Sequence, residues 1–259
     1  KDVYFKYPDA EEYMLKNILL TIEYCGKNYS GWQRQLNGVS VQEKIEDAIE
    51  KLTGQKIGIN GSGRTDAKVN ALGQCANFKI DCTIPPSKFG MALNSMLPED
   101  IRIVKSKEVD MDFHARYNAT GKHYRYTILN RTAPSAIYKH TTYHMKYPLD
   151  VDKMIKAGSY FVGKQDFRGF MSAGSKIKKT VRTIYSLDIT KDGDLIIIDI
   201  KGNGFLYNMV RIIAGTLTEV GRGNIPVEKI KDIIQSRDRS RCGPTLKASG
   251  LCLMEVYYD

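Results

Sequence analysis

The segment 61–67, Gly-Ser-Gly-Arg-Thr-Asp-Ala, limits the structure and chemistry of this chain more than any other. Its two glycines allow a tight turn and a close approach to a ligand, and apolar, strand-like segments flank it at 56–59 and 72–78. Asp66 follows Arg64 by two residues, and a neighbouring arginine favours an ionised carboxylate through charge-assisted hydrogen bonds. Two interpretations stay open: a structural turn with a local ion pair, or a single carboxylate nucleophile.

Other active-site chemistries find little support in the chain. Paired carboxylates in one loop would indicate glycoside hydrolysis, but Asp66 is the only carboxylate in this loop. There is no Ser-His-Asp or Cys-His pattern, and neither a dinucleotide motif nor a Walker loop. The 5 cysteines form no C-x-x-C pair and the 4 histidines lack zinc-site spacing with them. We therefore expect no metal site, and a reducing, cytoplasmic location.

The charge balance indicates a polyanionic partner. Net charge is +10, from 39 Lys and Arg against 29 Asp and Glu, and the excess is spread along the chain. Such an excess predicts attraction to nucleic acid first and to an anionic membrane surface second, with plain solubility charge as the alternative. No apolar run approaches the roughly 18 residues of a membrane helix, and no secretory signal is visible. We expect no membrane partner.

Residues 14–112 are expected to form a first α+β unit, which carries the Asp66 loop. We expect residues 1–13 to be a disordered leader or an artificial extension. Ser40 and Glu43 form a capping box that opens a helix. The order strand, helix, strand, strand, helix, strand is that of a ferredoxin-like split unit. The expected strands are 15–24, 56–60, 72–80 and 101–109, and the expected helices are 41–52 and 85–97.

Residues 113–259 are expected to form a second α+β unit. We predict an α+β fold in which two ferredoxin-like or RRM-like units lie side by side, forming a mixed, mostly antiparallel sheet with a central basic cleft. The polar stretch 163–182 has little regular signal and is expected to be a functional or mobile loop. The expected strands are 122–129, 184–190, 195–201 and 250–258, and the expected helices are 150–161, 204–220 and 226–236.

Aromatic and basic residues alternate in the strand expected at 122–129. Tyr124 and Tyr126 share one face, and His123 and Arg125 share the other. Such interleaving suits RNA, because bases stack on aromatic rings and phosphates meet guanidinium groups. A half-buried strand with a solvated basic face is the alternative. The basic residues that we consider for RNA contact here are His114, Arg116 and Arg125.

Two further sets of basic residues allow two interpretations each. Tyr207 and Arg211 are four apart in the helix expected at 204–220 and would share a face. Arg211 then meets solvent, which spacing alone favours, or pairs with a group across a cleft. In the polar stretch, a run of basic residues forms a solvated face or contacts phosphate. These residues are Lys164, Arg168, Lys176, Lys178, Lys179 and Arg182.

Taken together, collinear segments over nearly the whole chain from Leu15 onward resemble the TruA family of tRNA pseudouridine synthases. A lone Gly-Arg-Thr-Asp would not be specific, but the ordered set is. The segments are YSGWQRQ (29–35), SVQEKIEDAI (40–49), GRTDAKVNALGQ (63–74), FHARYNATGKHYRY (113–126), DFRGF (166–170), KKTVRTI (178–184), GFLYNMVRIIAGTL (204–217) and GPTLKASGLCLMEV (243–256).

The resemblance implies a function and roles for particular residues. It implies that Asp66 is the nucleophile, that Tyr124 contacts the target uracil, that Arg211 pairs with the aspartate and that Arg64 contacts RNA and helps to extrude the base. It also implies a homodimer without cofactor or metal that acts on uridines 38, 39 and 40 of the tRNA anticodon stem-loop. Lys68 and Gln74 belong to the same motif and are expected to contact the substrate.

The chain departs from the family pattern at a few positions. Lys68 stands where the family usually has glycine, Asn70 where it usually has histidine, and Tyr207-Asn208 where a histidine-rich pair is frequent. The first two changes leave Asp66 intact and bear more on the target uridines than on the chemistry. Two other hypotheses are an RNA-binding protein that has lost turnover, and an RNA folding helper whose catalysis is incidental.

Overall fold

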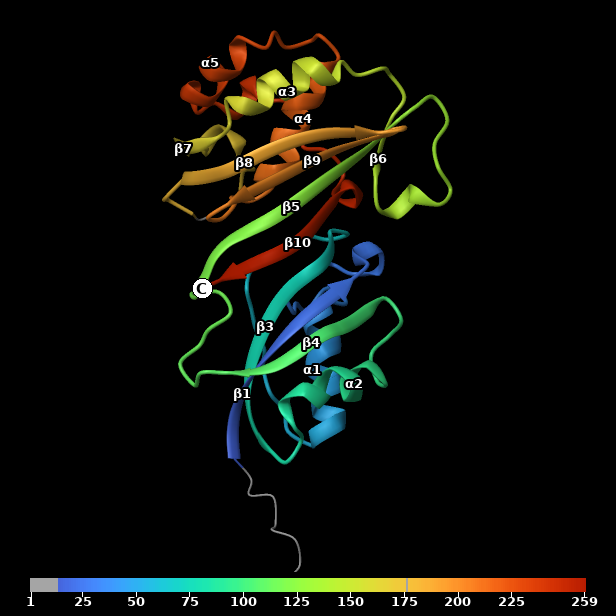
Figure 1. The fold of residues 1–259 in the computed structure, drawn as a ribbon, viewed down its shortest axis with the longest axis vertical. Helices are drawn as coiled ribbons and strands as arrows, with labels where there is room; N and C mark the ends of the chain where they lie inside the picture. Colours follow the sequence, from blue (N-terminus) through green and yellow to red (C-terminus); the bar gives the residue numbers. More distant parts are fainter. Residues whose placement is uncertain (1–13, 176) are drawn as a thin grey trace, which may run out of the picture.

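The computed structural model describes residues 14–175 and 177–259, and within them a single ten-stranded sheet runs through the molecule (Figure 1). The segment 1–13 and Lys176, both considered above, lie outside the described residues. The strand order is β4-β1-β3-β10-β5-β9-β8-β7, with β2 paired to β3 and β6 paired to β5. The first-half elements are β1 (Met14–Tyr24), η1 (Gly26–Asn28), α1 (Val41–Thr53), β2 (Asn60–Gly61), β3 (Asn70–Cys82), η2 (Pro86–Lys88), α2 (Phe89–Asn94) and β4 (Ile101–Val109).

The second half repeats the topology of the first. In the first half β1 lies between β4 and β3, and β2 pairs with β3; in the second half β5 lies between β10 and β9, and β8 pairs with β9, all antiparallel. Both halves therefore have the strand order of the split unit, and the predicted fold class is confirmed. The elements are β5 (Ala119–Asn130), η3 (Tyr138–His140), β6 (Tyr143–Met145), α3 (Val151–Ser159), β7 (Gly163–Asp166), η4 (Arg168–Phe170), β8 (Val181–Asp192), β9 (Leu195–Gly202), α4 (Met209–Gly221), α5 (Lys229–Ser236), η5 (Arg239–Arg241), η6 (Ala248–Gly250) and β10 (Leu251–Tyr258).

A short parallel contact between β3 and β10 joins the two halves. Only Cys252 with Asn70 and Leu253 with Ala71 are in register there, and Figure 1 shows β10 and β3 side by side in the middle of the molecule. Gly73 lets the strands cross closely, because a Cβ at this position would overlap the carbonyl oxygen of Met254. The Asp66 loop directly precedes the start of β3 at this crossing, and the other strand, β10, is the last strand of the chain.

Local sequence signals explain most of these elements. Ser40 accepts a hydrogen bond from the Glu43 amide and Glu43 reaches back to Ser40, so the predicted capping box opens α1. In β1, Ile18, Leu20 and Ile22 are fully buried, as strand alternation predicts. The strands expected at 184–190 and 195–201 form as β8 and β9, an antiparallel hairpin around Gly193, which has a positive φ.

Four predictions about secondary structure are wrong, and the first three concern residues 85–97, 56–60 and 163–182. The helix expected at 85–97 is only the turn η2 followed by the short helix α2, in which Leu93 is buried but Met91 is exposed. The strand expected at 56–60 is reduced to β2, since residues 55–59 have no regular structure. The polar stretch 163–182 contains β7, η4 and the start of β8, because β7 completes the edge of the sheet.

The helix expected at 204–220 begins only at Met209. Asn208 has a left-handed backbone and precedes the first turn, so Tyr207 and Arg211 do not share a helix face.

No helix within residues 14–175 and 177–259 is long and apolar enough to cross a bilayer.

Enlarging Gly73 is expected to weaken the junction between the halves. The added methyl group of Gly73→Ala meets the β10 backbone, which cannot rotate away, so the free energy of unfolding falls by roughly 1–3 kcal/mol. Urea denaturation measures this change. The control is Leu72→Ala at the neighbouring, half-exposed position, which should change stability by only about 0.5 kcal/mol; equal losses in the two variants would contradict the close crossing.

Candidate active site

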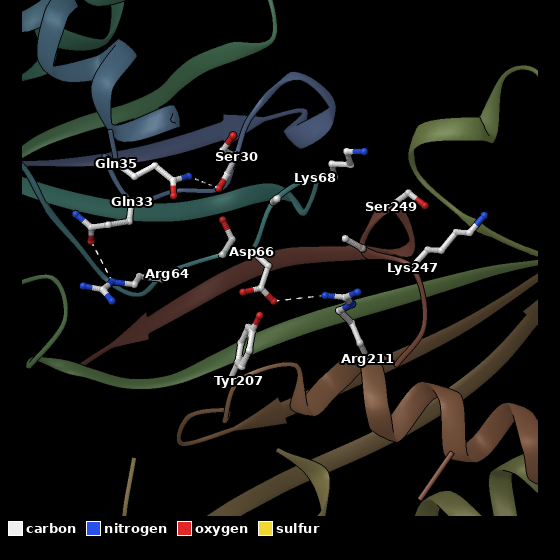
Figure 2. Close-up of a pocket in the computed structure, with 13 residues that line it drawn as sticks. Ser30, Gln33, Gln35, Arg64, Asp66, Lys68, Tyr207, Arg211, Lys247 and Ser249 are labelled. Atoms are coloured by element: carbon white, nitrogen blue, oxygen red, sulfur yellow. Dashed lines mark hydrogen bonds and ion pairs between the residues drawn. The ribbon is translucent and has the colours of Figure 1, made fainter. Parts of the chain in front are cut away.

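Two adjoining cavities open where the halves meet, and Asp66 belongs to both. The larger has a volume of about 1290 Å³ and is lined from the Asp66 loop, from β5 and from the segment before α4. The smaller, of about 920 Å³, lies on the side of η6. Figure 2 shows Asp66 between the strands of the two halves, with Arg211 and Tyr207 pointing toward it from the C-terminal half. The carboxylate is thus placed at the floor of a cleft between the halves.

Arg211 is the charged partner of Asp66. Its Nη1 atom lies 3.6 Å from Oδ2 of Asp66, and the side chains are 16% and 32% exposed, respectively. The guanidinium is fixed because Nε donates to the carbonyl oxygen of Leu246 at 2.7 Å and Nη1 donates to Oδ1 of Asn208 at 2.5 Å. The solvent-facing interpretation of Arg211, which spacing favoured, is therefore wrong: the residue pairs across the cleft.

Burial and charge act on Asp66 in opposite directions. Burial raises the pKa of the carboxyl group, because a charged form loses hydration in the cleft, and the Arg211 charge lowers it again. Burial is the larger effect, so the pKa lies above its ordinary value. Without Arg211, the ionised form of Asp66 would be still less favoured.

Tyr124 lies beside this pair on β5. Its side chain is buried and packs edge to face against Phe205, with ring centroids 5.3 Å apart. Burial and then the nearby Asp66 charge raise the pKa of the Tyr124 hydroxyl, so it stays protonated. Tyr124 and Phe205 also line the larger cavity, so an aromatic wall stands beside the carboxylate.

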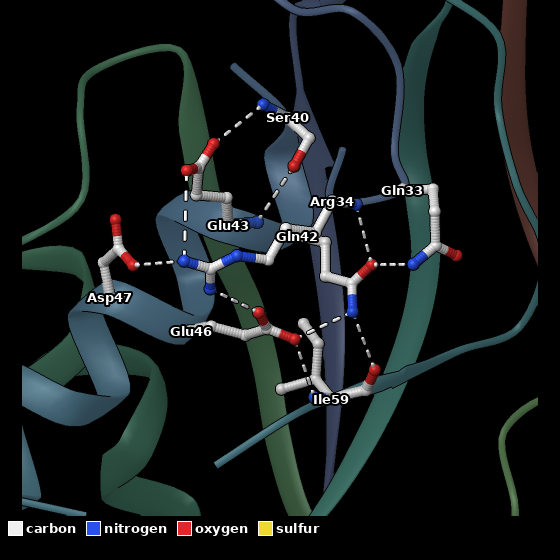
Figure 3. A network of polar contacts seen from close by, with 8 residues as sticks. All are labelled: Gln33, Arg34, Ser40, Gln42, Glu43, Glu46, Asp47 and Ile59. Atoms are coloured by element: carbon white, nitrogen blue, oxygen red, sulfur yellow. Dashed lines mark hydrogen bonds and ion pairs between the residues drawn. The ribbon is translucent and has the colours of Figure 1, made fainter. Parts of the chain in front are cut away.

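Arg64 does not pair with Asp66, so the interpretation of this loop as a turn with a local ion pair is wrong. Its Nε donates to Oε1 of Gln33 at 3.1 Å, Gln33 donates to Oε1 of Gln42 at 2.8 Å, and Gln42 donates to Glu46 at 2.8 Å. Glu46 in turn forms an ion pair of 2.9 Å with Arg34 (Figure 3). Arg64 thus lies at the end of an amide chain that starts at a nearly buried carboxylate.

The backbone of the Asp66 loop is held by buried partners. The hydroxyls of Tyr24 and Thr65 share a hydrogen bond of 2.7 Å, and the Trp32 amide donates to the carbonyl oxygen of Thr65 at 3.1 Å. Gly31 has a φ of 105°, and a Cβ there would lie 2.7 Å from the Thr65 oxygen, so this contact favours glycine. Asp66 is therefore presented by a fixed loop.

Gln74 supports the loop and does not line either cavity. It is fully buried, accepts a hydrogen bond of 2.6 Å from the Ser62 hydroxyl, and donates to the carbonyl oxygen of Gly63 at 3.0 Å. The structure thus places this residue, which was expected to contact the substrate, behind the loop.

Lys122 is a site residue that the sequence analysis did not identify. Its Nζ atom donates to the carbonyl oxygen of Ser62 at 2.9 Å and lies beneath Gly63, and burial lowers its pKa to about 8. Strand alternation could have indicated it, because Lys122 lies two residues before Tyr124 and so shares its face. It lines the larger cavity with Tyr124.

Two departures from the family pattern have structural explanations. Lys68 has a φ of 65°, a left-handed conformation that glycine adopts without strain; its side chain is exposed and lines the smaller cavity. Asn70 is buried and ties three loops together, since it accepts from the Gly26 amide at 2.9 Å and donates to the carbonyl oxygens of His140 and Ser249. Asn70 therefore faces neighbouring loops and lines neither cavity.

The remaining expected basic residues divide into two groups. His114, Arg116 and Arg182 line the larger cavity. Arg125 lies outside both cavities and pairs with Asp199 at 2.9 Å, as the half-buried interpretation of this strand face predicts. Lys178 and Lys179 are exposed and do not line either cavity.

In the part of the chain that the structure describes, no group of three His, Cys, Asp or Glu residues is placed to hold a metal ion.

A desolvated carboxylate with a fixed guanidinium partner, in a cleft between two RRM-like units of a chain with net charge +10, defines an enzyme with a polyanionic substrate. A family model described as tRNA pseudouridine synthase matches residues 20–118 and 157–259, and the chain belongs to this family.

Curated relatives agree with this assignment. The chain is 53% identical to tRNA pseudouridine synthase A of Acetivibrio thermocellus and 50% identical to tRNA pseudouridine synthase A 2 of Clostridium perfringens, each over 94% of this chain and 100% of the relative. A chain of a solved Cbf5-Nop10-Gar1 complex aligns with 12% identity and a TM-score of 0.36, over 91% of this chain and 57% of that chain, a likeness too weak to add to the assignment.

Replacing Lys68 by glycine is expected to stabilise the protein. The left-handed backbone at this position strains a residue with a Cβ, so Lys68→Gly should raise the free energy of unfolding by about 1 kcal/mol. Denaturant unfolding measures this, with Lys68→Ala as the control that removes the charge but retains the strain. A glycine variant no more stable than the alanine variant would contradict the strain.

Proposed function

We propose that this protein converts uridine to pseudouridine in the anticodon stem-loop of tRNA, with Asp66 as the nucleophile. The observation that carries the proposal is the ion pair of Asp66 and Arg211 beside Tyr124 at the cleft between the halves. Family membership and the relatives named tRNA pseudouridine synthase A support tRNA as the substrate. Uridines 38, 39 and 40 are the proposed targets, by resemblance to the TruA family.

The proposed reaction moves the ribose from nitrogen to carbon of the same base. Attack of the Asp66 carboxylate at the sugar carbon breaks its bond to N1 of uracil, and the detached base turns within the cavity. Carbon C5 then bonds to the sugar carbon and displaces Asp66. N1 gains a proton and C5 loses one, so atoms balance without a co-reactant.

The residues around Asp66 suit these steps. Arg211 favours the ionised carboxylate that attack requires. Tyr124 offers the detached uracil an aromatic wall and a hydroxyl that stays protonated. Tyr124 and Arg211 are thus proposed to contact base and nucleophile, respectively.

Binding of the RNA is proposed to involve both cavity walls. A uridine in a stem must leave the base stack before Asp66 can reach its sugar, which costs a few kcal/mol. We propose that Arg64 contacts the RNA and promotes this extrusion, since its terminal nitrogens have no hydrogen-bond partner within residues 14–175 and 177–259. Other proposed phosphate contacts, whose ion release would offset the cost, come from Lys68, His114, Arg116, Lys178, Lys179 and Arg182.

The proposal extends to the organisation of the protein. We propose that residues 14–112 and 113–259 act as two domains that hold the RNA between them, and that the protein is a cytoplasmic homodimer. Resemblance to the TruA family supports the dimer, and the tRNA substrate supports the location. Sedimentation of the protein with and without tRNA measures the subunit number.

The decisive experiment follows release of the C5 hydrogen. A tRNA transcript labelled with tritium at C5 of uridine should lose label with the wild type, whereas Asp66→Asn should reduce the rate by at least about 10³-fold because the amide is a poor nucleophile. Both proteins should bind the transcript with similar affinity. Equal release would remove Asp66 from the mechanism, and binding without release by the wild type would favour an RNA-binding protein or folding helper.

Breaking the amide chain behind Arg64 is expected to reduce catalytic efficiency. Gln33→Met removes the acceptor that fixes Arg64, and loss of a hydrogen bond to a charged group should lower kcat/KM roughly tenfold. The matched control is Gln35→Met, because Gln35 lines the same smaller cavity but donates to the carbonyl oxygen of Ser30. Equal kcat/KM values in the two variants would contradict a positioning role for Gln33.

A further inference from the structure

A tight turn at residues 114–118, called here the aromatic turn, presents an unusually open tyrosine at the larger cavity. The Tyr117 side chain is 76% exposed, although its ring lies 4.4 Å from the His114 ring between centroids. The guanidinium carbon of Arg116 lies 5.8 Å from the centroid of the same ring. His114, Arg116 and Tyr117 all line the cavity that contains Asp66 and Tyr124.

The aromatic turn is ordered by its own hydrogen bonds. The amides of Tyr117 and Asn118 both donate to the carbonyl oxygen of His114 at 3.0 Å. The His114 amide donates to Oδ1 of Asn118 at 2.8 Å, and the Arg116 amide donates to Nδ1 of His114 at 3.1 Å. The exposed ring is therefore held in place before a ligand arrives, which lowers the entropy lost on binding.

The turn is also anchored to the sheet. Ala115 is fully buried, its amide donates to Oδ1 of Asn77 on β3 at 2.8 Å, and its carbonyl oxygen accepts from the Tyr258 hydroxyl on β10 at 2.7 Å. The two strands of the junction between the halves thus support both the aromatic turn and the Asp66 loop. Their relative position is set by the same part of the sheet.

We propose that Tyr117 is a stacking platform for one nucleobase of the tRNA close to the target uridine, with Arg116 contacting a phosphate beside it. The inference rests on the proposed function and adds a base-binding subsite to it. A flat aromatic ring with one cation next to it matches the two parts of a nucleotide, the base and the phosphate. Arg116 forms no ion pair with any described residue, so its charge is open to an anion.

Stacking also explains why the ring is exposed beside an extrusion site. When the target uridine leaves the stem, its neighbours lose a stacking partner. A ring fixed at the mouth of the cavity replaces that partner without reading the base identity, because every base has a flat face. Tyr117 would therefore stabilise the opened stem and tolerate different tRNA sequences.

The chain contains a matched control for an exposed tyrosine with cations over its ring. Tyr147 is 51% exposed, with Nζ of Lys146 at 5.0 Å and the guanidinium carbon of Arg222 at 5.3 Å from its centroid, but it lines neither cavity. Tyr147→Ala should leave tRNA affinity unchanged. Because both tyrosines are exposed and have cations over their rings, a difference in tRNA affinity between the Tyr117 and Tyr147 variants is due to where each ring lies.

The test combines protein variants with abasic nucleotides in the tRNA transcript. Tyr117→Ala and Tyr117→Leu should weaken binding roughly tenfold, whereas Tyr117→Phe should bind like the wild type. For the wild type, removing one base close to the target should cost a similar factor. With Tyr117→Ala, removing that base should not weaken binding further, because the stacking contact between ring and base is already lost.

Each outcome decides between the platform and its alternatives. The platform would be overturned if the loss of affinity from Tyr117→Ala multiplied with the loss from the missing base at every abasic position. It would also be overturned if Tyr117→Leu bound the tRNA like the wild type. Circular dichroism and thermal unfolding of each variant separate lost stacking from lost folding. If wild type releases tritium from C5-labelled tRNA while Tyr117 proves neutral, only the platform fails; if wild type releases none, the proposed function fails first.

Discussion

The ion pair between Asp66 and Arg211 is the interaction on which the rest of this structure depends. It joins a loop of the first half to a helix of the second, so the Arg211 charge acts on the Asp66 carboxylate only where the two halves meet. Burial raises the pKa of Asp66 and Arg211 opposes that rise. A carboxylate placed in this way is less stable as an ion than one in water. The short crossing of β3 and β10 holds this arrangement, and Gly73 lets it form.

The surroundings of the pair serve to fix charged groups that would otherwise move. Arg211 is held by Leu246 and Asn208, and Arg64 by an amide chain that ends at Glu46. Such preorganisation matters for the proposed function, because side chains that are already ordered lose less entropy when the RNA binds. The cleft therefore has one guanidinium paired with Asp66 and another that is bound to Gln33 through Nε alone.

Sequence patterns predicted the fold well and the site only in part. The capping box of Ser40 and Glu43 and the alternation of β1 are local signals, and the first half forms α1 and β1 where they predict. The partner of Asp66 could not be predicted from spacing, because it lies on another element far along the chain. Gln74 and Arg125 are residue types that often contact RNA. Only the three-dimensional structure shows that Gln74 is buried behind the loop and that Arg125 pairs with Asp199. Lys122 was missed although strand alternation placed it beside Tyr124.

The pKa of Asp66, measured by ¹³C NMR with labelled aspartate and assigned with Asp66→Asn, tests the central claim most directly. The wild-type pKa should lie above the ordinary value of about 3.9, because burial outweighs the Arg211 charge. Arg211→Gln should raise it further, while Arg64→Gln should leave it unchanged, since Arg64 is bound to Gln33. An ordinary or lowered pKa in the wild type, or one that responds to Arg64 and not to Arg211, would contradict the account.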